Sequence, residues 1–231
     1  MSKKHIVVLT GAGISAESGL KTFRDGDGLW NGYSVYDVAT PGAWKKDPAL
    51  VLDFYNMRRR EVLKAAPNEA HKGLAALEKD FSVSIVTQNI DDLHERAGST
   101  NIVHLHGEIF KMRSDRNERL LYDTRDDIKL GDTAEDGAQL RPHIVWFEEP
   151  IPMIEKAADL VAACDCLVVV GTSLQVYPAA SLLHFAHSTT PRYIIDKKIP
   201  PVPGAANLTI IEKPATEGIT LLQQLLYSTL L

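Results

Sequence analysis

Four short segments of the chain are apolar at nearly every position, without the alternation of a half-exposed strand. They are 6–10 (IVVLT), 83–87 (VSIVT), 166–170 (CLVVV) and 192–196 (RYIID), and 102–106 (IVHLH) is a fifth candidate. Short runs rich in Val and Ile are typical of parallel strands that are covered on both faces. Helical patterns lie between them, at 48–66, 68–79, 152–163 and 178–187. This alternation predicts an α/β fold with a Rossmann-like, doubly wound parallel sheet.

These elements are unevenly spaced along the chain. More than seventy residues separate the first strand from the strand at 83–87, which is far more than one crossover helix requires. We therefore expect a smaller inserted helical segment at 24–81. A second insertion, 107–140, is dense in charge and is expected to form a small, solvated hairpin module. The Rossmann-like domain would then comprise 1–23, 82–106 and 141–231.

Composition and charge narrow the classes of function. The sequence is 45% hydrophobic and 24% charged, which is typical of a globular chain with a full core. Its net charge of −5 argues against non-specific binding to nucleic acid, which needs a basic face. No apolar run approaches the roughly 18 residues of a membrane span, and the first residues do not resemble a signal peptide. We expect a cytoplasmic protein without a membrane partner.

The two cysteines, Cys164 and Cys166, stand at the beginning of an apolar strand. A Cys-x-Cys pair could be redox-active or bind metal, but buried, unreactive thiols are the simpler interpretation. Two such residues form no disulfide framework, and they cannot alone supply the four ligands of a structural zinc site.

Polar and glycine residues follow the predicted strands, and ligands of such sheets bind outside the carboxyl ends of the strands. The stretch 11–16 (GAGISA) after the first strand fits the phosphate-binding pattern G-x-G-x-x-(G/A), although a tight turn would also need small residues. A dehydrogenase would carry an acidic residue about 20 positions later, at the end of the next strand. Here that stretch is turn-like and no strand precedes Asp37, while Asp196 closes a later strand and can serve a ribose. The pattern favours a nucleotide site and weakens hydride transfer.

Two further strand ends carry candidate chemistry. Gln88 to Asp91 place amides and a carboxylate where a carboxamide such as nicotinamide could bind, or where a helix could be capped. His104 and His106 alternate on one strand and share a face, but no third metal ligand stands nearby. His106, at the strand end, is the better candidate for a general base, and a purely structural histidine remains the alternative.

Two segments suggest substrate contacts. Residues 141–149 (RPHIVWFEE) alternate like a half-exposed strand, whose edge could pair with an extended peptide or be an ordinary edge. Tyr55 and Arg58 lie three positions apart on a predicted helix and could form a clamp for a carboxylate. The alternative is that MRRRE is simply a solvated basic face.

Together these residues resemble the sirtuin family of NAD-dependent protein-lysine deacylases. The matching blocks are GAGISAESGL–TFR, TQNIDDLHERAG, HLHG, RPHIVWF and GTSLQVYPAA, in family order. They span nearly the whole chain apart from 107–140 and the C-terminal tail. The segments GLKTFR, DVATP and FYNMRRR are similar to the bacterial branch that also removes succinyl groups.

The resemblance implies a role for each matching position. Catalysis would rest on His106 as general base and on Asn89. NAD, consumed as a co-substrate, would be held by Gly11, Ala12, Gly13, Ile14, Ser15, Ala16, Phe23, Arg24, Trp30, Gln88, Asn89, Ile90, Asp91, Gly171, Thr172, Ser173, Ile195, Asp196, Lys197 and Ala215. The acyl-lysine substrate, in an extended conformation, would be bound by Ala39, Tyr55, Arg58, Val145 and Phe147. Nicotinamide would leave as the acyl oxygen attacks the ribose, and the products would be lysine and 2′-O-acyl-ADP-ribose.

The chain departs from the family pattern at two places. The four zinc cysteines usual between the HLHG and RPH blocks are missing, and Ser114 stands where the first is expected. We therefore expect no zinc, and a hairpin with LLYDTRDDIKL as its core. Asp196 replaces the usual Asn. The hypothesis is a monomeric deacetylase and desuccinylase, with an NAD- or ADP-ribose-binding module or a protein ADP-ribosyltransferase as alternatives.

Overall fold

The large lobe is built on a six-stranded parallel sheet. The computed structural model describes residues 2–22, 30, 32–199 and 207–231. Within these ranges the strand order is β3-β2-β1-β7-β8-β9, and every neighbouring pair is parallel. The strands are β1 (His5–Thr10), β2 (Ser82–Thr87), β3 (Ile102–His104), β7 (Cys166–Val170), β8 (Arg192–Asp196) and β9 (Leu208–Glu212). This is the doubly wound parallel sheet that the apolar runs predict.

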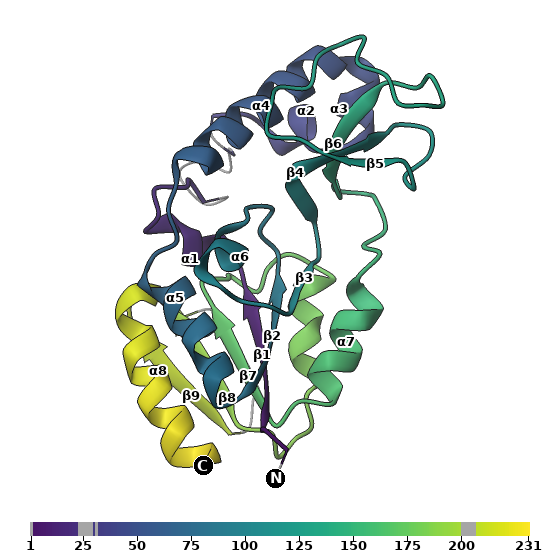
Figure 1. Ribbon diagram of the computed structural model, residues 1–231. Helices are drawn as coiled ribbons and strands as arrows, with labels where there is room; N and C mark the ends of the chain where they lie inside the picture. Colours follow the sequence, from purple (N-terminus) through teal and green to yellow (C-terminus); the bar gives the residue numbers. More distant parts are fainter. Residues whose placement is uncertain (1, 23–29, 31, 200–206) are drawn as a thin grey trace.

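Helices cover both faces of this sheet (Figure 1). One face packs against α5 (Glu69–Ala76) with its 3-10 extension Leu77–Lys79, and against α8 (Ala215–Leu230). The other face packs against α7 (Ile154–Ala162) and the 3-10 helix Ala179–Phe185. Successive residues of a strand point to opposite faces, so Ile6 belongs to the first core and Val7 to the second. Both layers are therefore buried, which explains strands without polar alternation.

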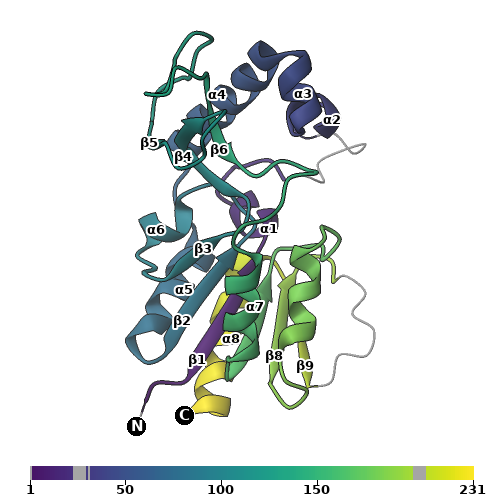
Figure 2. The same cartoon turned by 90° about the vertical axis from the view of Figure 1, so that its right-hand side faces the viewer.

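A smaller lobe stands over the carboxyl ends of the strands (Figures 1 and 2). It combines helices with a three-stranded antiparallel sheet of order β5-β4-β6. The helices are α2 (Val35–Val38), α3 (Pro41–Lys46) and α4 (Pro48–Lys64), and the strands are β4 (Gly107–Ser114), β5 (Leu121–Asp123) and β6 (Leu140–Ile144). Thr40 and Asp47 cap α3 and α4 through their side chains, and each is followed by a proline at the first helical position.

The small sheet is fastened to α4 by buried hydrogen bonds. Asn56 donates from Nδ2 to the carbonyl of Ile128 at 2.9 Å and accepts the Ile128 N–H at 2.9 Å through Oδ1. Arg59 is fully buried, donates from Nε to the carbonyl of Ile109 at 2.9 Å, and reaches Asn56 Oδ1 at 2.7 Å. The two side chains tie the irregular segment of the module and its first long strand to one helix.

The structure departs from the sequence predictions in several details. The strand predicted at 102–106 ends at His104, and the strand-like alternation of 141–149 continues a strand only to Ile144. The helix predicted at 178–187 is a 3-10 helix over Ala179–Phe185. The predicted inserted segment 24–81 contributes α2, α3 and α4 to the small lobe, whereas its α5 covers the large sheet. The alternative of a solvated basic face is wrong for Arg58 and Arg59, which are buried: Arg58 contacts the Lys21 carbonyl and the Trp30 ring, and Arg59 bonds to Ile109 of the small sheet.

Two elements after residue 196 have no counterpart in the predictions. Strand β9 adds the outer edge of the large sheet beside β8, and α8 returns across the sheet to pack against α5. Gly73 and Gly218 allow close packing there, since an added Cβ would lie 2.4 Å from Ile219 or Ile195 side-chain atoms. None of the helices in the described ranges combines the length and hydropathy that crossing a lipid bilayer requires.

Candidate active site

A cavity of about 1000 Å³ lies between the lobes, at the carboxyl ends of β1, β2, β7 and β8. Most of the residues that the resemblance assigns to the nucleotide line it. They are Gly11, Ala12, Gly13, Ser15, Ala16, Trp30, Gln88, Asn89, Ile90, Asp91, Gly171, Thr172, Ser173, Ile195, Asp196, Lys197 and Ala215. Ile14 does not line the cavity: it is fully buried in the core beneath it. Phe23 and Arg24 lie outside the described residues.

The glycine turn after β1 packs tightly against the loop that follows β7. A Cβ on Gly11 would lie 2.7 Å from Thr172 Cβ, and one on Gly13 would lie 2.7 Å from Gly171 Cα. Gly13 donates its N–H to the Gly171 carbonyl at 2.8 Å. The glycines therefore bring two backbone segments together on one wall of the cavity. This wall stands at the carboxyl ends of β1 and β7, where ligands of doubly wound sheets bind.

A buried polar cluster follows the glycine turn. Ser15 donates to Asp91 Oδ2 at 3.0 Å and accepts from Asn89 Nδ2 at 3.1 Å. Asn89 Nδ2 also reaches the Gly11 carbonyl at 3.2 Å. Burial raises the pKa of Asp91, whereas hydrogen bonds from the Leu93 N–H and the Ser15 hydroxyl lower it. The amide and the carboxylate are thus held in fixed orientations at the cavity wall.

Two neutral histidines support this cluster from behind. His71 Nε2 lies 3.5 Å from Ser15 Oγ, and His94 Nε2 lies 3.0 Å from Thr10 Oγ1. Their rings meet edge to face with centroids 4.9 Å apart, and both residues are fully buried. Burial lowers the pKa of His71 to about 4 and that of His94 well below its usual value. Both imidazoles are therefore uncharged at neutral pH.

The two histidines of the 102–106 segment have different surroundings. His106 lines the cavity, and its Nδ1 lies 3.0 Å from the carbonyl of Gln88. A carbonyl only accepts, so Nδ1 carries the proton and Nε2 keeps its lone pair. Burial lowers the pKa of His106, although the Gln88 carbonyl raises it. His104 does not line this cavity and is fixed between the Asn89 carbonyl and the Glu95 carboxylate, 2.7 Å away.

The turn after His106 requires glycine. Gly107 has a φ of 82°, and a Cβ there would lie 2.1 Å from the His143 carbonyl oxygen. The backbone can therefore leave β3 at once and enter the small lobe, which keeps His106 at the boundary between the two lobes.

At the far end of the cavity, the loops after β7 and β8 carry polar groups. Gln88 donates from Nε2 to Thr172 Oγ1 at 3.0 Å, linking the loops after β2 and β7. Asp196 accepts the Lys198 N–H at 3.0 Å, and Lys197 lies 3.6 Å from Glu17. The carboxylate oxygens of Asp196 have further lone pairs, which can accept a hydrogen bond from a ribose hydroxyl.

The small-lobe wall contains all five positions assigned to the acyl-lysine: Ala39, Tyr55, Arg58, Val145 and Phe147. Tyr55 is fully buried, and its hydroxyl has no hydrogen-bond partner in the described part of the chain. Burial raises the pKa of Tyr55. Arg58 Nη1 pairs with Glu61 at 2.7 Å and Nη2 donates to the Lys21 carbonyl at 3.4 Å, whereas Nε has no hydrogen-bond partner among the described residues. The Tyr55 hydroxyl and the Arg58 Nε–H are thus two donors of this wall that one ligand group could engage.

Several further residues line the cavity without a role predicted from the sequence. They are Leu20, Lys21, Thr22, Val35, Tyr36, Ile144, Trp146, Glu148, Glu149, Ile151, Gln175, Val176, Tyr177 and Pro178. Most of them are sequence neighbours of a residue with a predicted role, and this neighbourhood is the signal by which they could have been found. Tyr36 and Tyr177 are 74% and 71% exposed, and only the fold brings these two distant segments to one cavity.

Hydrogen bonds organise the end of the small sheet around Ser114, where the resemblance leads one to expect a zinc ligand. Ser114 donates to Asp136 Oδ2 at 2.7 Å and accepts the N–H groups of Arg116 and Asn117 at 3.1 and 3.2 Å. In the ranges that the structure describes, no three His, Cys, Asp or Glu side chains are grouped to hold a metal ion.

Comparison with known proteins agrees with this architecture. The Sir2 family model matches residues 11–178. A protein named NAD-dependent protein deacylase from Helicobacter pylori (strain ATCC 700392 / 26695) is 56% identical over 195 residues, covering 84% of this chain and 85% of that protein. One of the same name from Bacteroides thetaiotaomicron is 50% identical over 229 residues, covering 96% and 98%.

Solved structures lead to the same family. A Sir2 homolog in complex with NAD superposes with a TM-score of 0.87 and 37% identity, covering 99% of this chain and 91% of that chain. A Sir2 protein with a deacetylated peptide and an acetyl-ADP-ribose has a TM-score of 0.80 and 31% identity, covering 98% and 94%. The chain belongs to the Sir2 family.

Proposed function

We propose that this chain is an NAD-dependent protein-lysine deacylase that removes both acetyl and acidic acyl groups such as succinyl. The observation that carries the proposal is that one cavity joins the glycine turn, the Asn89–Asp91 cluster, His106 and the Tyr55–Arg58 pair. The names of the relatives support NAD as co-substrate and an acylated protein as substrate. The released products would be nicotinamide and 2′-O-acyl-ADP-ribose.

The residues present fit NAD. The glycine turn and the Gly171–Ser173 loop form the cavity wall at the ends of β1 and β7, where the cofactor of such sheets binds, and Asp196 offers an acceptor for a ribose. When bound, NAD supplies a ribose carbon that becomes electrophilic as nicotinamide departs. Asn89 and Asp91 stand at the wall where amide and carboxylate groups can orient the carboxamide of nicotinamide.

His106 is the group that can move a proton in this cavity. Its Nδ1–H is held by the Gln88 carbonyl, which fixes the ring and leaves Nε2 free to accept a proton from a ribose hydroxyl. Because burial lowers the pKa of His106, the imidazole is already in its basic form at neutral pH. Ser15, itself bonded to Asp91, accepts from the Asn89 amide and orients it before the ligand binds, as a preorganised polar site requires.

The preference for acidic acyl groups rests on Tyr55 and Arg58. A succinyl carboxylate could accept from the Tyr55 hydroxyl and the Arg58 Nε, both of which lack other partners in the described part of the protein. Arg58 also lies with its Cζ 5.6 Å from the Trp30 ring centroid, which holds the guanidinium beside an aromatic wall. An acetyl group would leave both donors unpaired, so the pair distinguishes the two acyl groups.

The test is nicotinamide release from NAD with acetyl-lysine, succinyl-lysine and unmodified lysine peptides. We expect release with both acyl peptides and none with the unmodified one. Arg58→Met should lower kcat/KM for the succinyl peptide at least tenfold while changing that for the acetyl peptide about twofold. Equal losses on both peptides would remove Arg58 from the specificity argument. NAD binding without turnover on any acyl peptide, or label from NAD on protein, would support the two alternatives instead.

A further inference from the structure

Residues 144–149 line the small-lobe wall of the cavity, and after Ile144 they have no regular secondary structure. After β6 ends at Ile144, residues 145–149 turn, with Glu148 at a φ of 72° and the Glu149 N–H bonded to the Trp146 carbonyl at 3.1 Å. Val145 donates to the His106 carbonyl at 3.0 Å, and Phe147 donates to the Ala39 carbonyl at 3.0 Å. This segment, 144–149, therefore touches both lobes and depends on side chains for its shape.

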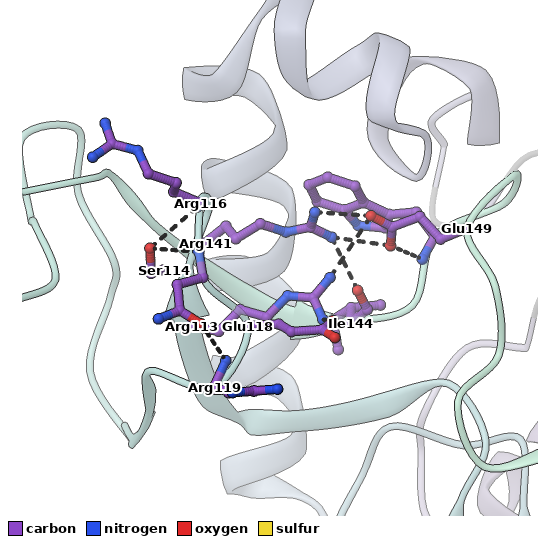
Figure 3. Close-up of polar contacts among 10 residues, drawn as sticks. Arg113, Ser114, Arg116, Glu118, Arg119, Arg141, Ile144 and Glu149 are labelled. Atoms are coloured by element: carbon purple, nitrogen blue, oxygen red, sulfur yellow. Dashed lines mark hydrogen bonds and ion pairs between the residues drawn. The ribbon is translucent and has the colours of Figure 1, made fainter. Parts of the chain in front are cut away.

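A buried ion pair closes the segment back on its own strand (Figure 3). Arg141 Nη1 lies 2.9 Å from Glu149 Oε1, and Nη2 lies 3.2 Å from Oε2, so the contact is bidentate. Nη2 also donates to the Ile144 carbonyl at 3.0 Å. The side chains of Arg141 and Glu149 are only 6% and 18% exposed. Bidentate geometry fixes distance and angle together, which a single contact cannot do.

The same two residues hold the aromatic residue between them. Glu149 Oε2 accepts the main-chain N–H of Trp146 at 2.8 Å, and Arg141 Cζ lies 3.3 Å from the Trp146 ring centroid. Trp146 itself lines the cavity. The main chain and the side chain at the middle of the segment are thus both fixed by the pair.

A second arginine extends the network into the small sheet. Arg113 pairs with Arg141 across β4 and β6, and its Nη2 lies 3.7 Å from Glu149 Oε1. Its Nη1 lies 3.5 Å from Glu118, a largely exposed side chain. Burial and the neighbouring Arg141 lower the pKa of Arg113. Removing the Glu149 charge would leave two adjacent buried guanidinium groups without their common counter-ion.

We propose that Arg141 and Glu149 are positioning residues that set the affinity for the substrate peptide by fixing segment 144–149. Neither takes part in the proton transfer, because the ring of His106 is oriented by Gln88 on the other lobe. This inference rests on the proposed deacylase function. The bidentate contact fixes the distance and the angle between β6 and the end of the segment, and a peptide-binding wall needs such a fixed geometry.

The test compares steady-state constants of Glu149→Gln and Arg141→Lys with those of the wild-type protein on an acetyl-lysine peptide. Glutamine keeps an acceptor for Trp146 but loses the charge, and lysine keeps the charge but loses the bidentate contact. We expect peptide KM to rise at least tenfold in Glu149→Gln and about fivefold in Arg141→Lys. The kcat at saturating peptide and the KM for NAD should stay within about threefold. Glu118→Gln, at the exposed end of the network, is the matched control and should change none of these constants more than twofold.

An unchanged peptide KM in folded variants, or equal losses in kcat and in NAD affinity, would overturn the positioning role. If Glu149→Gln fails to fold, the milder Arg141→Lys carries the same expectation, and circular dichroism identifies that case. Absence of turnover by the wild-type protein would overturn the proposed function and this inference together. Wild-type turnover with unaffected variants would overturn this inference alone.

Discussion

Replacing Asn56 by leucine tests how the small lobe is held together without zinc ligands. Asn56 is buried, and its side-chain amide forms hydrogen bonds with the main-chain N–H and carbonyl of Ile128 and with Arg59 Nη1. Leucine has a similar size but no polar atom, so three buried groups lose their partner. Leaving such a group unpaired costs about 1–3 kcal/mol, so we expect a loss of about 3–5 kcal/mol after local relaxation. Whole domains have only about 5–15 kcal/mol of stability.

The three tryptophans give this measurement a local probe. Trp30, Trp44 and Trp146 all belong to the core of the small lobe or pack against it. In a urea titration, tryptophan fluorescence of Asn56→Leu should therefore change at lower urea than in the wild type. Asn117→Ala, which removes an exposed side chain with one local hydrogen bond, is the matched control and should cost less than 1 kcal/mol by the same principle. If the free energy of unfolding of Asn56→Leu fell by less than about 1 kcal/mol, the Asn56 hydrogen bonds would not be what holds the small lobe together.

Three other features of the protein, namely the Tyr55 hydroxyl, the buried His71 and the missing zinc cysteines, each give a further prediction. Tyr55→Phe removes a hydroxyl without a partner among the described residues, so the free energy of unfolding should not fall, while kcat/KM for a succinyl peptide should drop about tenfold relative to an acetyl peptide. The pKa of His71 is about 4 in the folded state and near 6.5 in the unfolded state, so only the unfolded state takes up a proton between these values. The free energy of unfolding should therefore fall as the pH decreases below 6.5, by about 2 kcal/mol at pH 5 for this residue. Equal urea midpoints at pH 7.5 and pH 5 would contradict this expectation. Purified protein should contain no stoichiometric zinc by metal analysis, and a chelator should leave the thermal midpoint unchanged, whereas a chelator-dependent drop would show that a metal holds the small lobe.

The sequence predicted the strands best where a strand is buried on both of its faces. Apolar runs predicted β1, β2, β7 and β8 to within a residue, because burial on both faces leaves no position for a polar side chain. The final elements β9 and α8 were missed. Strand β9 is an edge strand with Thr209, Ile210 and Glu212 exposed, so its pattern is mixed, and its assignment depends on pairing with β8.

The candidate site was predictable as separate blocks but not as one cavity. Glycines directly after a strand indicate a phosphate-type turn from local sequence alone, whereas the burial of Arg59 depends on Ile109, which follows fifty residues later in the chain. The strand prediction for 141–149 was wrong beyond Ile144 because alternation alone does not reveal the contact of Arg141 with Glu149. Contacts between side chains outside one regular element leave no trace in the hydrophobic periodicity of the sequence.

The most direct test of the account is the product balance of one reaction. The wild-type protein is incubated with NAD and an acetyl-lysine peptide, and nicotinamide, deacylated peptide and nucleotide product are quantified by mass spectrometry. We predict equal amounts of nicotinamide, free lysine peptide and O-acetyl-ADP-ribose, and loss of all three in His106→Ala. Nicotinamide accompanied by free ADP-ribose, or by ADP-ribosylated protein with the peptide still acetylated, would contradict the account.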